Sequence, residues 1–199
     1  MKISVMPLGA YQTNTYILWN EEDTRCLVID PGYEPEEILD YVNHNNLTLE
    51  AILLTHGHFD HVGAVRQLVA DTGCRVFLNP ADCSMPPMMT SGALYYTDTY
   101  TGGETLELAG LTFGVMSTPG HTPGSVCLIF GTDIFCGDTL FAGSCGRTDL
   151  PGGHGPTLRK SLDRLKALEG NFFLHPGHGP GSDLSRERRT NPYLMGGMV

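Results

Sequence analysis

The sequence predicts a fold of the α/β or α+β class, in which helices pack on β-sheet. Short runs rich in β-branched and aromatic residues, each bounded by turn residues, predict strands, and amphipathic segments alternate with them between residues 25 and 79. Further strand-like runs follow residue 103, and they too are followed by a helical segment. Because a β-rich segment is followed by an α/β segment twice, the chain resembles two similar halves.

In the first half, strands are predicted for residues 2–8, 13–19, 25–30, 50–55 and 75–79. A helix over 35–45 is predicted by Pro35 at its first position and by an apolar face that contains Ile38 and Val42. A second helix is expected over 61–73, ended by its final glycine.

The second half begins after an irregular segment, residues 82–96, which contains two adjacent prolines and three methionines. Two hairpins are then predicted, over 104–120 with its turn at Gly110 and over 124–141 with its turn at 131–133. Leucines at helical spacing predict a helix over residues 156–170, and a last strand over 171–179 ends in a glycine-rich turn.

Composition limits the classes of function. A chain of 199 residues suits one domain, so we expect residues 1–199 to form a single domain. A formal charge of -10 argues against a general nucleic-acid or membrane-surface binder. The six cysteines include no C-x-x-C pair, and several stand in apolar runs, which predicts reduced thiols and a cytoplasmic protein. No segment is apolar enough for a signal peptide or a membrane span.

The stretch THGHFDH, residues 55–61, crowds ionisable side chains at the end of a predicted strand. Side chains at alternate positions of extended backbone project the same way, so His56 and His58 can converge on one point. Asp60 and His61, at the start of the next predicted helix, can reach a second point nearby.

Three further polar residues follow apolar strands beside glycine, namely His121, Asp138 and His178. Five imidazoles, two carboxylates and no cysteine fit a site for two divalent metal ions, with zinc the expected metal and iron or manganese the alternatives. Such a centre provides a bridging hydroxide that is nucleophilic at neutral pH.

At these residues the sequence closely resembles the metallo-β-lactamase superfamily. THGHFDH matches its H-x-H-x-D-H pattern, and VIDPG, TPGHTPGS, GDTLFAGSCGRTDL and PGHG stand in the family's order. Within the superfamily, residues 137–153 and 186–194 are most similar to the short, single-domain branch of glyoxalase II, or hydroxyacylglutathione hydrolase.

The resemblance implies an αββα sandwich of two mixed β-sheets flanked by helices, with the metals at one edge of both sheets. It assigns to the first metal His56, His58 and His121. It assigns to the second metal Asp60, His61 and His178, with Asp138 bridging the two ions. Larger members of the branch carry a C-terminal helical domain that binds glutathione. This chain extends 21 residues beyond His178, so we expect that domain to be absent. The resemblance therefore does not specify which thiol the substrate carries.

Two residues outside the ligand set are also candidates. Asp30 is expected to orient a histidine rather than to bind metal. Arg147 either forms an ion pair with Asp149 or binds a substrate carboxylate.

The expected function is hydrolysis of a small-molecule thioester such as S-lactoylglutathione, with Asp60 and Asp138 as catalytic residues. The resemblance also allows a mononuclear iron persulfide dioxygenase, with His56, His121 and Asp138 as ligands, and a lactonase or phosphodiesterase. We expect no nucleic-acid or membrane partner, and a monomer or small homo-oligomer.

Overall fold

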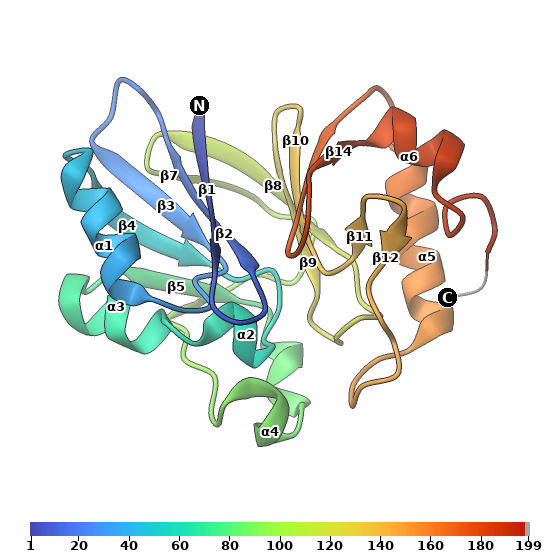
Figure 1. The fold of residues 1–199 in the computed structure, drawn as a ribbon, viewed down its shortest axis with the longest axis horizontal. Helices are drawn as coiled ribbons and strands as arrows, with labels where there is room; N and C mark the ends of the chain where they lie inside the picture. Colours follow the sequence, from blue (N-terminus) through green and yellow to red (C-terminus); the bar gives the residue numbers. More distant parts are fainter. Residues whose placement is uncertain (198–199) are drawn as a thin grey trace.

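Two six-stranded sheets pack face to face, and helices cover the outer face of each sheet (Figure 1). The computed structural model describes residues 1–197. The arrangement confirms the predicted αββα sandwich of two mixed sheets.

The first sheet has the strand order β1-β2-β3-β4-β5-β6. Its first three strands pair antiparallel and the others pair parallel, as expected when helices connect them. Its strands are β1 Lys2–Leu8, β2 Thr13–Trp19, β3 Arg25–Ile29, β4 Thr48–Leu53, β5 Arg75–Leu78 and β6 Asp98–Thr99. The helices of this half are α1 Pro35–His44, α2 Phe59–Val62, α3 Val65–Thr72, the 3₁₀ helix η1 Pro80–Ser84 and α4 Pro87–Thr90.

The single helix expected over residues 61–73 is divided into α2 and α3. The division comes from the close approach of the segment that follows β3. The backbone N–H of Ala64 donates to the carbonyl of Pro31. A β-carbon at Gly63 would lie 2.3 Å from the carbonyl oxygen of Gly32. This tertiary contact replaces helical hydrogen bonds at the junction, and sequence periodicity carries no sign of it.

The second sheet has the order β14-β13-β10-β9-β8-β7. Both predicted hairpins are present, and the first turns at Ala109–Gly110, where both residues have positive φ. Its strands are β7 Thr105–Leu108, β8 Leu111–Ser117, β9 Val126–Phe130, β10 Asp133–Gly137, β13 Phe173–Pro176 and β14 Ser182–Asp183. The remaining elements are the ribbon β11 Leu140–Phe141 with β12 Ser144–Cys145, and the helices α5 Gly155–Lys166 and α6 Leu184–Thr190.

Three apolar layers hold the sandwich together. Along β2, Leu18 points into the layer between the sheets and Ile17 into the layer beneath the helices, and both are 0% exposed. The third layer joins the second sheet to α5 and α6 and includes Leu162. Because the central strands are buried on both faces, their ends form a rigid support for the loops that follow them.

The two sheets are also joined by polar contacts at one edge. Thr13 of β2 pairs with His178 beyond β13 through a β-bridge, and the backbone N–H of Asn14 donates to the carbonyl of Gly177 over 2.7 Å. The side-chain amide of Asn14 donates to Pro176 and Gly179. The segment that carries His178 is therefore attached to the first sheet as well as to its own.

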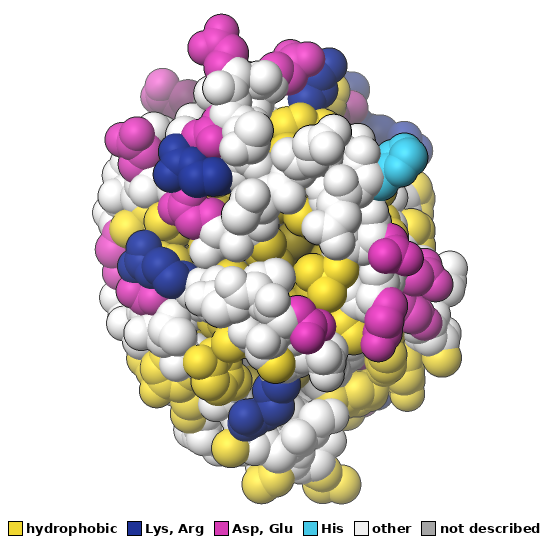
Figure 2. All heavy atoms as spheres, turned by 90° about the vertical axis from the view of Figure 1, so that its left-hand side faces the viewer, with side chains coloured by type: hydrophobic (Ala, Val, Ile, Leu, Met, Phe, Trp, Pro, Cys, Tyr) yellow, Lys and Arg dark blue, Asp and Glu magenta, His cyan; other side chains and the backbone are white. Residues whose placement is uncertain are grey.

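Among residues 1–197, no helix is long and apolar enough to cross a membrane. The outer face of the first sheet's helix layer carries charges of both signs, and hydrophobic side chains gather at its lower end over α4 (Figure 2). Met88 of α4 is 81% exposed.

Candidate metal centre

All seven predicted ligands come together at one edge of the sandwich. Each follows the end of a strand, in segments that lie far apart in the sequence. The first half provides four of them after β4, namely His56, His58, Asp60 and His61. The second half provides three, after β8, β10 and β13, namely His121, Asp138 and His178.

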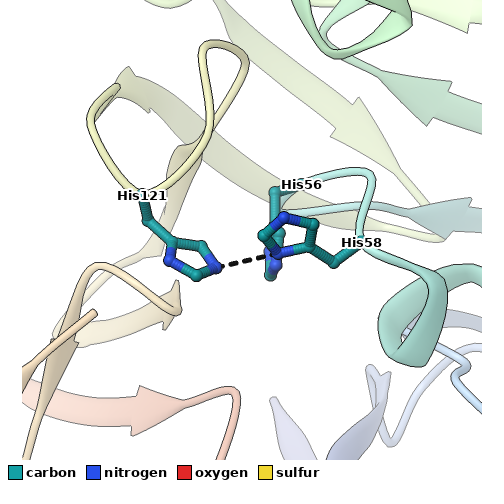
Figure 3. A group of neighbouring side chains, drawn as sticks. All are labelled: His56, His58 and His121. Atoms are coloured by element: carbon teal, nitrogen blue, oxygen red, sulfur yellow. Dashed lines mark hydrogen bonds between the residues drawn. The ribbon is translucent and has the colours of Figure 1, made fainter. Parts of the chain in front are cut away.

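The first group consists of His56, His58 and His121, and all three are buried. One ligand atom from each lies within 4.8 Å of the others. Figure 3 shows the three imidazoles turned toward one another from two separate loops. His121 Nε2 is 2.9 Å from His58 Nδ1. This spacing would allow the three imidazoles to bind one metal ion.

The second group consists of Asp60, His61 and His178, whose ligand atoms also lie within 4.8 Å of one another. His178 Nε2 is 3.2 Å from Asp60 Oδ2 and 3.3 Å from His61 Nε2. Asp60 and His61 are adjacent residues of α2, a single turn, and His61 Nε2 lies 3.7 Å from Asp60 Oδ2.

Asp138 lies between the two groups. Its Oδ2 is 3.5 Å from His121 Nε2 in the first group. Its Oδ1 is 3.5 Å from His61 Nε2 in the second group. Oδ2 also lies 3.6 Å from His178 Nε2 of the second group, so this one carboxylate faces ring nitrogens of both groups, as a bridging ligand would.

Hydrogen bonds to the outer nitrogens fix several rings. His61 Nδ1 bonds Asp30 Oδ2 over 2.9 Å, and His121 Nδ1 bonds the carbonyl of Arg147 over 2.8 Å. His178 Nδ1 bonds the carbonyl of Tyr11 over 3.1 Å. Because these acceptors have no proton, each Nδ1 carries a hydrogen, so in the neutral ring the lone pair is on Nε2 and faces the centre.

Asp30 has the role expected from the sequence. Its carboxylate accepts hydrogen bonds from the backbone N–H and the hydroxyl of Thr55, at 2.7 and 2.6 Å, in addition to the bond from His61. Asp30 is also close enough to His56 and His61 to form a ligand group with them. Because three donors already occupy its oxygens, we assign it to orienting His61.

The protonation of the cluster follows from burial and neighbouring charges. Burial and the adjacent imidazoles lower the pKa of His56 well below its ordinary value and that of His58 to about 4. Burial also opposes the charged form of His61, but the carboxylates of Asp138 and Asp30 outweigh it and raise its pKa to about 9. Burial raises the pKa of Asp60, but its hydrogen bond to His178 and the charges of His61 and His178 together outweigh this and lower the pKa to about 2.

These residues fit divalent metal ions. His56 Nε2, His58 Nε2 and Asp138 Oδ1 are buried without a hydrogen-bond partner among the described residues, an arrangement that costs free energy unless another group satisfies them. Ring nitrogens also face one another at 2.9 and 3.3 Å, where lone pairs repel unless a cation or a proton lies between them. Imidazole and carboxylate together suit zinc, iron and manganese.

A cavity of about 630 Å³ opens above the centre. Its lining includes ligands of both groups, and much of its wall is apolar, formed by Tyr11, Phe59, Met89, Phe141 and Leu150. These wall residues were not predicted from the sequence. They come from separate segments and share no spacing, so their convergence depends on the tertiary structure.

Arg147 lines the same cavity, but its guanidinium is paired with Asp149. Nε and Nη2 each donate over 2.7 Å to a different oxygen of that carboxylate. The ion pair considered from the sequence is therefore present. A contact between Arg147 and a substrate carboxylate stays a prediction.

Comparison with known proteins identifies the family. The family model of the metallo-beta-lactamase superfamily matches residues 8–178. The hydroxyacylglutathione hydrolase GloC of Haemophilus influenzae is 35% identical over 209 residues, which cover 98% of each chain. The chain belongs to the metallo-beta-lactamase superfamily.

Solved structures have the same architecture. The BLEG-1 B3 metallo-beta-lactamase matches with a TM-score of 0.90 and 33% identity, and the match covers 98% of this chain and 100% of that one. The di-iron-bound form of TTHA1623 matches with a TM-score of 0.83 and 40% identity, covering 96% of this chain and 100% of that one.

Proposed function

We propose that this protein is a metal-dependent hydrolase of thioesters, similar to glyoxalase II, that releases an acid and a thiol. The observation that carries the proposal is the position of Asp138 between two ligand groups on the floor of a substrate-sized cavity. The similarity to GloC, a hydroxyacylglutathione hydrolase, supports a thioester as the substrate.

The ligand roles follow from the two groups. His56, His58 and His121 would hold one ion, and Asp60, His61 and His178 the other. Asp138 would contribute an oxygen to each. Bound divalent ions supply a Lewis acid for the substrate carbonyl and lower the pKa of water, and zinc is the metal we expect.

The protein's own groups complete the site. Asp60 stays ionised at neutral pH because its pKa is about 2, so its oxygens can accept a hydrogen bond from an attacking water. Cys145 lines the cavity, but burial raises the pKa of its thiol to about 11, which keeps it protonated and a poor nucleophile. Hydrolysis is therefore assigned to water rather than to a covalent intermediate on cysteine.

The apolar wall suits the uncharged parts of the substrate. Tyr11 and Phe59 pack edge to face, with ring centroids 5.3 Å apart, and hold one side of the cavity in shape. Phe141 and Leu150 form further apolar parts of the lining. This environment can exclude bulk water from the thioester while the polar floor binds its carbonyl.

The test is metal content measured together with a substrate panel. Purified protein should contain two zinc-like ions per chain and should hydrolyse thioesters faster than lactones or phosphodiesters. Asp138→Asn should lower both turnover and bound metal. Asp98→Asn, which changes a carboxylate paired with Arg75 at the edge of the first sheet, should leave both unchanged.

Two results would overturn the proposal. One is a single iron per chain with oxygen consumption on glutathione persulfide, the behaviour of a dioxygenase. The other is full turnover by Asp138→Asn with unchanged metal content.

A further inference from the structure

A buried carboxylate outside the ligand set joins the two loops of the first group. Asp82 lies in η1, which follows β5, and is 0% exposed. Its Oδ2 accepts the backbone N–H of Gly57 over 2.7 Å, and its Oδ1 accepts that of Gly124 over 2.6 Å. The hydroxyl of Thr122 donates to Oδ2 over 3.0 Å. One side chain therefore binds two loops through three hydrogen bonds.

The bonded positions lie next to the ligands. Gly57 stands between His56 and His58, and Thr122 directly follows His121. The approach is too close for larger residues, because a β-carbon at Gly57 would lie 3.1 Å from Asp82 Cβ. A β-carbon on the other loop, at Gly124, would lie 2.7 Å from Asp82 Cγ.

The arrangement has an energetic reason. A buried carboxylate is costly unless hydrogen bonds replace its water, and here both loops provide them. If either loop moves away, one oxygen loses its donor and the buried charge becomes unsatisfied. The low-energy state of Asp82 is thus the one in which the two loops keep their spacing.

We propose that Asp82 is a positioning residue that holds His56, His58 and His121 at the spacing that one metal ion requires, and so sets the affinity of the first group. This inference rests on the proposed metal centre but not on the reaction. The second group has separate supports, since His61 is held by Asp30 and His178 by the carbonyl of Tyr11.

Asparagine at this position separates the effect of the hydrogen bonds from the effect of side-chain volume. Asp82→Asn has nearly the same size, but its NH₂ must replace one of the two oxygens. Each oxygen faces a backbone N–H, so the amide places a donor against the donor of either Gly57 or Gly124. One loop then loses its hydrogen bond although the side chain still fills its space.

The test measures metal affinity at each group separately, by competition with a chromophoric chelator. His178→Ala leaves the first group intact, and His58→Ala leaves the second group intact. Adding Asp82→Asn should weaken zinc binding about 10- to 100-fold in the His178→Ala background. In the His58→Ala background, it should change the affinity less than about two-fold. Asp98→Asn in both backgrounds is the control for a lost carboxylate.

An equal loss in both backgrounds, or no loss in either, would overturn the inference. If Asp82→Asn does not fold, as judged by circular dichroism, Thr122→Val replaces it and removes the hydroxyl's bonds to Asp82 and to Ser125 with nearly unchanged volume. Its effect should be smaller but again confined to the His178→Ala background, and an effect on both groups would reject the proposal. Failure to hydrolyse thioesters, with these affinities as expected, would reject the proposed function alone.

Discussion

Replacing Asp30 with asparagine should weaken metal binding at the second group through the proton on His61. Asp30 has φ 49°, a left-handed conformation that asparagine also adopts, so the backbone should tolerate the change. The carboxylate accepts from the Thr55 N–H through Oδ1 and from His61 Nδ1 through Oδ2. An asparagine must keep its oxygen toward the N–H of Thr55, which leaves its NH₂ facing His61.

The consequence is a change of tautomer. With a donor beside it, His61 Nδ1 must accept, so the neutral ring carries its proton on Nε2. That nitrogen faces Asp60 and Asp138, at 3.7 and 3.5 Å, and is the predicted ligand atom. Changes to groups that orient metal-bound histidines cost about 10- to 100-fold in affinity, or about 1.4 to 2.7 kcal/mol.

Chelator competition in the His58→Ala background measures this affinity directly. Asp133→Asn is a matched control, because it removes the charge from another carboxylate–histidine contact, between Asp133 and His175 at 2.8 Å, away from the centre. The control should bind zinc as tightly as the unsubstituted protein. Unchanged affinity in Asp30→Asn, or an equal loss in Asp133→Asn, would refute the tautomer explanation.

Three other variants test the site and the core. Burial and neighbouring imidazoles lower the pKa of His58 from 6.5 to about 4, so stability that its neutral ring provides above pH 6.5 is lost as the pH falls from 6.5 through 4. His58→Ala should therefore make the free energy of unfolding of the metal-free protein, measured in urea, less dependent on pH between 6.5 and 4. Asp149→Asn should release Arg147 and lower KM several-fold for carboxylate-bearing thioesters but not for neutral ones, as steady-state kinetics would show. Leu162→Ala, at a site that is 0% exposed, should cost about 2–5 kcal/mol in chemical denaturation.

Most of the fold could be predicted because its signals are local. The strands of both sheets, except the two-residue β6 and β14, and the helix beginning at Pro35 follow from short apolar runs, turn residues and helix-start residues. The division between α2 and α3 could not be predicted, since it depends on a carbonyl of the distant Pro31. The packing of the two sheets into one sandwich was predicted only from the family resemblance, because local sequence patterns do not specify which sheets pack together.

The convergence of the candidate ligands could be predicted for a similar reason. Histidine and aspartate beside glycine at strand ends are unusual enough in sequence to indicate metal chemistry, and His121 and His178 are examples. Asp82 carries no such sign. It stands in a proline-rich segment, and its partners Gly57 and Gly124 become apparent only when two loops meet in space. Residues that act through such contacts need a structure to be found.

The attachment of the His178 segment to β2 gives the metals a second consequence. His61 and His178 are 117 positions apart, so an ion held by both acts as a reversible cross-link between the two halves of the chain. A ligand that binds only the folded state, present at 100 times its dissociation constant, stabilises that state by about 2.7 kcal/mol. Removing metal with a chelator should therefore lower the midpoint in scanning calorimetry for the whole molecule. The availability of metal would then affect the stability of the folded protein as well as its proposed activity.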